Sequence, residues 1–335
     1  MRIFFFLILL SSISGFAQKT LNGNVYSAKD STALEAVSVY FDGTTLGTIT
    51  NSSGAYSIPI QEGIKSSLVI SMLGYTPVYV SNYLNTNGQI APIYLTENTE
   101  ELSAVHIEND DWSRKKKLNV FRKEFLGNSL QALECKILNE DDLKLHYSKS
   151  TKQLTAWADV PLVIENKHLG YLVNYTLTDF QVNYEKSIET GFTYVHQVYT
   201  EGFTFFKELK KKTKRKFIVN RQKSYLGSTL HFLRSLSQEQ LTENRFKIYY
   251  KSFEVAPYSR FKLQRENSSM HVELTVDKLS ILYNNEEQSF IQAQAPFIID
   301  AFGNHSPASA LSTGGVMSLK RFAFMLPLDY KFRQE

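Results

Sequence analysis

Six glycines between residues 23 and 74 separate short runs of alternating apolar residues, and this pattern constrains the fold of the chain more than any other. Glycine tolerates the positive φ angles of tight turns, so its frequent recurrence marks short strands joined by turns. The alternation within each run favours strands that bury one face. The pattern predicts a small antiparallel β-sandwich. The glycines are Gly23, Gly43, Gly47, Gly54, Gly63 and Gly74.

The extreme N-terminus has the three-part pattern of a signal peptide. Arg2 supplies positive charge, Ile3 to Leu10 are apolar, and the following residues become small and polar up to Ala17. This order predicts a signal peptide over residues 1–17, with cleavage after Ala17. The apolar run is shorter than the roughly 20 residues that span a bilayer, so we expect an exported protein without a transmembrane helix in its mature chain. Its predicted location is the periplasm or the outer membrane.

Cys135 is the only cysteine, so no disulfide can form within the chain. A lone cysteine excludes zinc sites of the multi-cysteine type and favours a small buried side chain over a nucleophile. The formal net charge is only +4 in 335 residues, and removal of Arg2 with the signal peptide lowers it further. So small a charge gives no reason to expect a nucleic-acid partner.

The chain is long enough for more than one hydrophobic core. We predict the β-sandwich over residues 18–97, a charged linker over 98–117, and a larger β-rich domain with a few helices over 118–335. The linker prediction rests on adjacent acidic and basic runs with little apolar content besides Trp112. The overall fold class is therefore mainly β.

Three segments of the second domain carry specific predictions. Apolar residues from Leu118 to Cys135 recur at helical spacing, and Gly227 to Leu241 is a second helical segment that Ser224 or Ser228 would cap. Strict alternation from Phe322 to Phe332 predicts a final strand.

The first domain resembles the carboxypeptidase regulatory-like family, a transthyretin-like sandwich found beside metallocarboxypeptidase domains and at the front of many outer-membrane transporters of Bacteroidota. Asn51 and Glu35 stand where the family usually has Asp and Pro. The residues that carry the resemblance are Gly23 to Val25, Leu34 to Val39, Gly43 to Tyr56 and Ser71 to Tyr75.

This resemblance implies an auxiliary domain without chemistry of its own. The His-x-x-Glu spacing of a metallocarboxypeptidase zinc site is absent from the sequence. His106 with Glu108 and His271 with Glu273 show a shorter His-x-Glu spacing, which we interpret as the polar face of a strand. Asp300, His305 and Ser306 lie close in sequence, but one loop cannot readily arrange a catalytic triad. We therefore predict no catalytic residue, no metal and no cofactor.

Residues 101–107 resemble the junction that leads from this module into transporters. The second domain weakly resembles uncharacterised Bacteroidota envelope proteins, through residues 125–127, 156–161 and 169–171. That group implies no known activity.

One strongly basic segment stands out in the second domain, with Glu208 as its only acidic residue. Its positive field would attract an anionic glycan, lipopolysaccharide phosphates or an acidic partner. The alternative interpretation is a solvated loop between two strands. The residues are Lys207, Lys210, Lys211, Lys212, Lys214, Arg215 and Lys216.

The sequence thus predicts an exported, non-catalytic cell-envelope protein that binds or scaffolds a glycan, a peptide or a partner protein. Two alternatives remain at this point. One is an enzyme whose site lies in the second domain, and the other is a small outer-membrane barrel or transporter accessory. Membrane association without a transmembrane helix also stays open.

Overall fold

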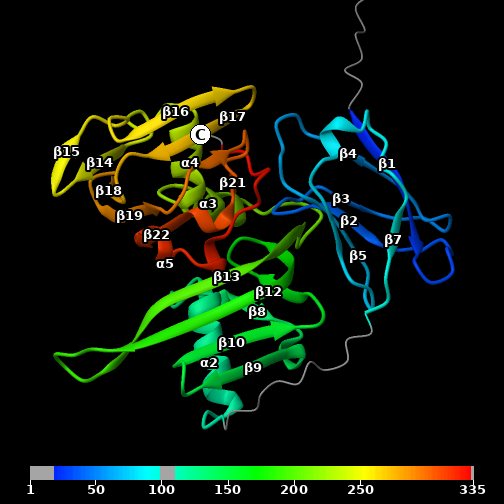
Figure 1. Ribbon diagram of the computed structural model, residues 1–335, viewed down its shortest axis with the longest axis horizontal. Coiled ribbons are helices and arrows are strands. Elements are labelled where there is room, and N and C mark those ends of the chain that lie inside the picture. The colour runs from blue at the N-terminus through cyan, green and yellow to red at the C-terminus, as the bar shows by residue number, and fades with distance from the viewer. Residues whose placement is uncertain (1–18, 99–109, 333–335) are drawn as a thin grey trace, which may run out of the picture.

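The computed structural model describes residues 19–98 and 110–332 (Figure 1). The fold is mainly β, as predicted, with five sheets and a few short helices. The predicted signal peptide and the motif around His106 lie outside the described residues. No helix among the described residues is long and apolar enough to cross a membrane.

The N-terminal domain is a β-sandwich of two sheets. One has the strand order β4-β1-β7 and the other β3-β2-β5-β6, and all pairings are antiparallel except that of β1 with β7. Inward side chains such as Leu21, Val39 and Ile70 are fully buried between the sheets. The elements are β1 Thr20–Ser27, β2 Ser38–Phe41, β3 Gly47–Ile49, β4 Ala55–Pro59, β5 Leu68–Ser71, β6 Val78–Val80, η2 Tyr83–Asn85 and β7 Ile93–Leu95.

The turn before β4 shows why the sequence pattern works. Gly54 has a φ of +72°, and a Cβ there would collide with the carbonyl oxygen of Val25. The Asn51 side-chain oxygen accepts hydrogen bonds from the backbone of Ser53 (3.0 Å) and Ala55 (3.0 Å). An amide oxygen can accept these bonds as a carboxylate would, so the departure from the family's Asp leaves the turn intact.

A third sheet, the six-stranded sheet, begins after α2 and has the order β8-β11-β12-β10-β9, with β13 paired to β12. Helix α2 packs on it through Phe121 and Phe125, whose rings contact Phe180. The elements are α2 Arg114–Phe125, η3 Ala132–Glu134, β8 Cys135–Ile137, η4 Glu140–Asp142, β9 Leu143–Ser148, β10 Gln153–Ala158, β11 Leu162–Asn166, β12 Tyr171–Lys186 and β13 Thr193–Glu208.

Helix α2 corrects two predictions. It begins inside the predicted linker, because Ser113 caps it and Lys117 pairs with Asp110. It ends at Phe125, ten residues before Cys135, and Gly127 with a φ of +116° turns the chain away. Leu130 and Leu133, predicted to lie on the apolar face of the helix, are 79% and 81% exposed.

The remaining elements form a third region with its own core. One sheet has the order β15-β14-β18-β19-β22, and the other has the order β16-β17-β20-β21. The elements are α3 Arg215–Tyr225, α4 Thr229–Ser237, β14 Phe246–Tyr250, β15 Phe253–Val255, β16 Phe261–Glu266, β17 Ser269–Leu274, β18 Lys278–Tyr283, β19 Glu287–Ala293, β20 Phe297–Ile299, β21 His305–Ser306, η5 Ala308–Ala310, β22 Leu311–Gly315, α5 Val316–Leu319 and η6 Phe322–Phe324.

Residues 118–335, predicted as one domain, hold two separate clusters of buried apolar side chains. The helix predicted over Gly227 to Leu241 is present but shorter, as α4, which ends at Ser237, and the Ser228 side chain accepts a hydrogen bond from the His231 backbone (3.1 Å). The predicted strand over Phe322–Phe332 is wrong. Its first residues form η6, and Arg234 donates hydrogen bonds to the carbonyl oxygens of Leu328 (2.7 Å) and Tyr330 (2.9 Å), so a side chain rather than a neighbouring strand holds this backbone.

The N-terminal domain joins the outer edge of β13 through backbone hydrogen bonds. The Gly43 N–H donates to the Thr204 carbonyl (2.8 Å), and the Phe206 N–H donates to the Thr44 carbonyl (3.0 Å). The Asp42 carboxylate accepts from the Thr204 N–H (2.7 Å), and Leu328 donates to Gly43 (2.7 Å). Three parts of the chain therefore meet at one end of β13.

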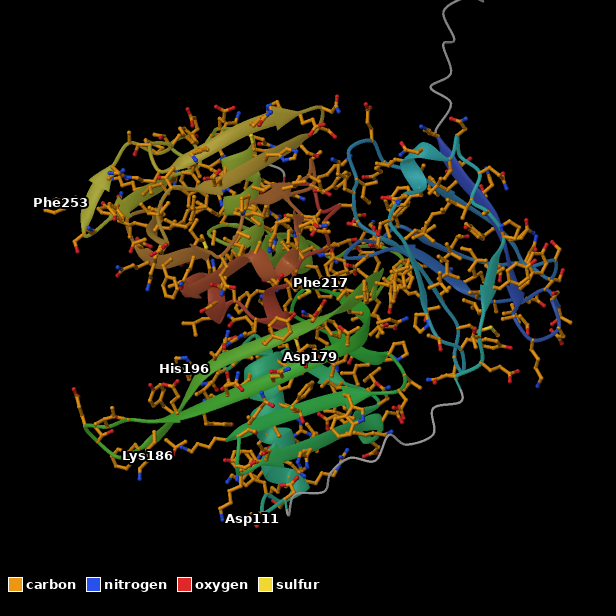
Figure 2. All side chains as sticks on the ribbon, viewed as in Figure 1. Asp111, Asp179, Lys186, His196, Phe217 and Phe253 are labelled. Carbon is orange, nitrogen blue, oxygen red and sulfur yellow. The ribbon has the colours of Figure 1, made fainter. Side chains whose placement is uncertain are left out.

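The other end of β13 forms a hairpin arm with β12 that projects from the body of the molecule (Figure 2). Lys186 and His196 lie on this arm. Its tip exposes two large apolar side chains, Ile188 (102%) and Phe192 (77%).

Candidate functional site

The predicted basic residues lie where β13 ends and α3 begins. Lys207 is on β13, residues 209–214 connect the two elements, and Arg215 and Lys216 form the first turn of α3. The segment includes an exposed loop, but this loop joins a strand to a helix and not two strands, so that part of the loop interpretation is wrong. All seven basic side chains, Lys207, Lys210, Lys211, Lys212, Lys214, Arg215 and Lys216, are exposed.

The start of α3 has an unusual charge for a helix. Its first turn has no acidic residue, no side chain caps it, and it contains Arg215 and Lys216. Cations at a helix N-terminus oppose the helix dipole and typically weaken a helix by about 0.3–1 kcal/mol each. The sequence thus concentrates positive charge at a point where helix stability alone would favour negative charge.

Few of these cations are neutralised. The Lys216 Nζ atom lies 3.2 Å from Glu134 Oε2, and the Lys207 Nζ atom lies 5.3 Å from the centre of the Phe205 ring. The other five cations form no ion pair within the described parts of the chain. They are Lys210, Lys211, Lys212, Lys214 and Arg215, which make up five of the six residues from 210 to 215.

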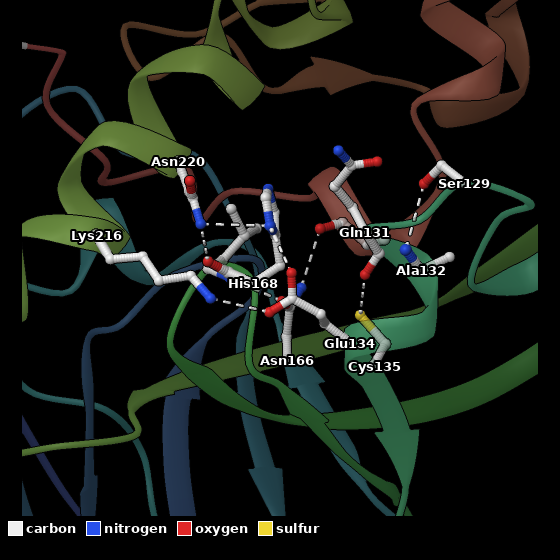
Figure 3. A network of polar contacts seen from close by, with 11 residues as sticks. Ser129, Gln131, Ala132, Glu134, Cys135, Asn166, His168, Lys216 and Asn220 are labelled. Carbon is white, nitrogen blue, oxygen red and sulfur yellow. Dashed lines mark hydrogen bonds and ion pairs between the residues drawn. The ribbon is translucent and has the colours of Figure 1, made fainter.

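A polar network attaches this basic segment to the six-stranded sheet (Figure 3). Glu134 contacts both Lys216 and the His168 ring, whose Nδ1 atom lies 3.4 Å from Glu134 Oε1. The Asn220 side chain donates to the His168 carbonyl (2.7 Å). These contacts connect α3 to the start of β8 and to the turn after β11.

The electrostatics of this network favour neutral histidine and charged glutamate. Burial lowers the pKa of His168, more than Glu134 raises it. Burial alone would raise the pKa of Glu134, but Lys216 and His168 together hold it below its usual value. The neighbouring Cys135 is buried, as predicted, and burial raises the pKa of its thiol to about 12. A thiol with that pKa is not a nucleophile at neutral pH.

A cavity of about 360 Å³ lies beside the basic segment and is lined by all three parts of the chain, including Thr45, Thr213, Ile218 and Lys331. Arg221 forms its wall, stacked 3.8 Å from the Tyr171 ring centre. The Arg221 guanidinium makes two hydrogen bonds to Glu208 (2.8 and 2.9 Å) and one to the Leu169 carbonyl (2.8 Å). Since this guanidinium is already bonded, Lys331 is the lining cation without an ion pair in the described structure, and the basic segment reaches the cavity through Glu208 and Thr213.

The other residues singled out in the sequence have local roles. His271 lies 2.9 Å from Glu266, and Glu273 lies 2.7 Å from Lys262, so the His-x-Glu pair makes two separate surface contacts. Asp300 accepts hydrogen bonds from the backbone of Phe302 (2.9 Å), Asn304 (3.0 Å) and Lys65 (3.1 Å). It thereby organises a loop and contacts the N-terminal domain. In residues 19–98 and 110–332, no group of three or more His, Cys, Asp or Glu could hold a metal ion.

Comparison with family models identifies the first domain. Residues 21–107 match the CarboxypepD_reg-like domain. The predicted resemblance is confirmed for this part of the chain, and the CarboxypepD_reg-like domain is the sandwich that contacts β13. No curated protein gave a match.

Two solved structures align with the chain, each over about half of its own length. A mutant type II cohesin–X-dockerin complex from Acetivibrio cellulolyticus aligns over 23% of this chain and 51% of its own, with 19% identity and a TM-score of 0.18. A 9R-lipoxygenase from Cyanothece PCC8801 aligns over 65% of this chain and 45% of its own, with 10% identity and a TM-score of 0.19. TM-scores this low support no inference about fold or function.

Proposed function

We propose that this chain is an exported, non-catalytic cell-envelope protein whose basic segment, residues 207–216, binds an anionic glycan. The observation that carries the proposal is the group of five cations at residues 210–215 without ion pairs in the described structure. Like charges held together repel one another, and a polyanion relieves that repulsion. Lysine ammonium groups on flexible stems adapt to irregularly spaced sulfates, carboxylates or phosphates better than a rigid bidentate site would.

The local structure supports binding over catalysis at this place. The basic side chains are exposed and stand on a segment fixed at both ends, by β13 and by the contacts of α3 with Glu134 and His168. A fixed backbone limits the entropy lost on binding, while exposed cations give a rapid, salt-dependent association. The adjoining cavity of about 360 Å³ offers room for a sugar unit of the glycan.

The direct test is titration of the full mature chain with dextran sulfate, using uncharged dextran as the ligand control. We expect binding of dextran sulfate that weakens as salt rises, because screening shortens the reach of exposed charges. The triple variant Lys210→Glu, Lys211→Glu and Lys212→Glu should weaken binding at least about tenfold, equivalent to about 1.4 kcal/mol.

A matched control variant keeps the same change in net charge at other sites. Lys65, Lys115 and Lys136 are exposed and form no ion pair in the described structure, so each can be changed to Glu. The proposal fails if both triple variants weaken binding equally, because net charge and not the basic segment would then govern it. It also fails if dextran binds as well as dextran sulfate.

The cellular location is part of the proposal and rests on the pattern of residues 1–17. Fractionation of the native host tests it with carbonate and detergent washes. We expect the chain in the periplasmic or outer-membrane fraction, and recovery in the cytoplasm would contradict export. The enzyme alternative stays a prediction, since no contact at the site favours a particular reaction.

A further inference from the structure

The outer edge of β13, which faces away from β12, is covered by another domain in one part and unpaired in the other. At Thr204 and Phe206 the CarboxypepD_reg-like domain occupies it through Gly43 and Thr44. From Thr193 to Phe203, β13 pairs only with β12, and no other strand of the described structure lies along it. An unpaired strand edge presents a row of N–H and C=O groups that can accept another strand.

The register identifies which groups face outward. Both the N–H and the C=O of Thr204 are bonded to the N-terminal domain, so this residue faces away from β12. The β-bulge near Leu177 adds one extra residue, Thr178, to β12. It adds none to β13, so the backbone groups of successive β13 residues continue to face the two edges in alternation here. Because alternate residues of a strand bond to the same side, Gly202 and Thr200 also face outward.

A second open edge lies opposite. Strand β22 ends its five-stranded sheet and pairs only with β19 among the described strands. A groove of about 540 Å³ separates β22 from the middle of β13, lined on one side by Thr200 and Glu201 and on the other by Ser312 and Thr313. Figure 1 shows β22 and α5 beside β13 at this place. Its volume is within the range of sites that enclose small ligands or short peptide segments.

The two cations that line the groove already have acidic partners. Arg321 lies 3.7 Å from Glu124, and Lys320 lies 2.9 Å from Glu287. The Tyr199 hydroxyl donates to Glu201 (2.6 Å), which raises the pKa of Tyr199 to about 12. A groove with hydroxyl groups, aromatic rings, cations that are already paired and the Glu201 carboxylate suits a polar but uncharged occupant better than an anion.

We propose that this groove binds an extended, uncharged segment of a partner polypeptide, which adds as a strand to β13 at Thr200 and Gly202. The contact made by Gly43 and Thr44 supports this occupant, because it shows the same edge exchanging backbone hydrogen bonds with another polypeptide segment four residues further along. Strand addition supplies main-chain hydrogen bonds, and the groove supplies contacts for side chains. At about 3.3 Å per residue, four residues would span about 13 Å of the edge. This inference is independent of the proposed glycan site.

The test uses the full mature chain and an array of random uncharged decapeptides. The best-binding peptide is then remade in two forms, with backbone N-methyl groups on one or the other alternate set of residues. We expect one form to lose at least about tenfold in affinity and the other to bind nearly as well, since only alternate N–H groups of an added strand bond to the edge.

Two variants at one position probe the same bond from the protein side. Thr200→Pro removes the outward N–H and should weaken binding at least about tenfold, whereas Thr200→Val keeps that N–H and should bind within about twofold of the parent chain. Hydrogen exchange in the unmodified chain gives a readout that needs no variant. The bound peptide should slow exchange at the amides of Thr200 and Gly202.

Several results would overturn this proposal. They are an array without binders, a binder indifferent to both sets of N-methyl groups, and protection confined to residues 210–215. Concentration-dependent dimerisation that protects the same amides would replace the partner with a second copy of this chain. The variant with glutamate at residues 210–212 should keep peptide binding unchanged, which separates this site from the glycan site.

Discussion

Strand β13 contains two stretches, Thr204–Phe206 and Tyr199–Gly202, that both pair with β12. Their other edges, which face away from β12, have different surroundings. The first is covered by the CarboxypepD_reg-like domain, through the backbone of Gly43 and Thr44 and the carboxylate of Asp42. The second faces a groove. A sheet edge can thus be closed by a neighbouring domain at one point and left available a few residues away, within a single regular strand.

The aromatic side chains also differ between the covered end of β13 and the hairpin arm. Phe203 stacks on Tyr79 with ring centres 4.1 Å apart, and Phe205 stacks on Tyr40 at 4.8 Å. Towards the tip of the arm, Phe192 stacks on no other ring of residues 19–98 and 110–332, and it is 77% exposed. Stability should therefore depend strongly on the covered end of β13 and weakly on its open part. The following predictions test this contrast.

The largest effect is expected from Arg234→Met. Arg234 donates to the carbonyl oxygens of Phe302 (2.9 Å), Leu328 (2.7 Å) and Tyr330 (2.9 Å), and Leu328 in turn donates to Gly43. Loss of these charged hydrogen bonds should lower the free energy of unfolding by about 3–5 kcal/mol, because three carbonyl oxygens lose their partner. Denaturant unfolding measures it, with exposed Arg215→Met as the control. A loss below about 1 kcal/mol would show that the covered end holds without this anchor.

A matched pair of proline substitutions compares the two stretches directly. Thr204→Pro removes the N–H that bonds to Asp42 and should cost about 2–3 kcal/mol, because a half-buried carboxylate loses a donor. Thr200→Pro removes an N–H that the register of β13 directs away from β12 and should cost less than about 1 kcal/mol. Thermal and denaturant unfolding of the two variants decide the matter. Equal losses would contradict the division of the edge into covered and open stretches.

The covered end should also respond to pH. Burial raises the pKa of Asp42 to about 6, despite the hydrogen bonds from Thr204 and Gly43 that lower it. The folded state then holds a proton between about pH 4 and 6 that the unfolded state has released, so stability falls as pH rises through this window. Asp42→Asn cannot titrate. Relative to the parent chain, it should gain about 1–3 kcal/mol between pH 4.5 and pH 7.5.

Urea unfolding at the two pH values measures this difference. Asp300, whose pKa burial also raises, remains in both proteins and cancels in the comparison. A parent chain that loses no stability relative to Asp42→Asn over this range would place Asp42 in contact with water.

The sequence predicted the sandwich well because its turns need particular residues. Gly54 and Gly74 adopt positive φ angles, and Tyr56 is buried, all from signals within a few residues. Ser228 as a helix cap belongs to the same class. Such local signals predict structure correctly even when the contacts between distant parts of the chain are unknown.

The sequence failed where distant contacts decide the structure. Alternation from Phe322 to Phe332 was interpreted as a strand, but Arg234 fixes this segment from almost a hundred residues away. Helix α3 was missed because its apolar residues are few and its sequence begins within a run of cations. The basic residues of the candidate site were found from composition, whereas Glu134, His168 and Asn220, which hold that segment, come from elements far apart in sequence.

The smallest effect is expected at the tip of the arm. Phe192→Ser should change the free energy of unfolding by less than about 0.5 kcal/mol, because a side chain that is 77% exposed loses little packing when it is shortened. Ile188→Ser, at a fully exposed position, should behave in the same way. Denaturant unfolding of each variant tests this, with Phe205→Ser at the covered end as the contrasting case. A loss above about 1 kcal/mol at Phe192 would mean that the arm packs against the body of the protein in solution, and the open part of β13 would then be covered as well.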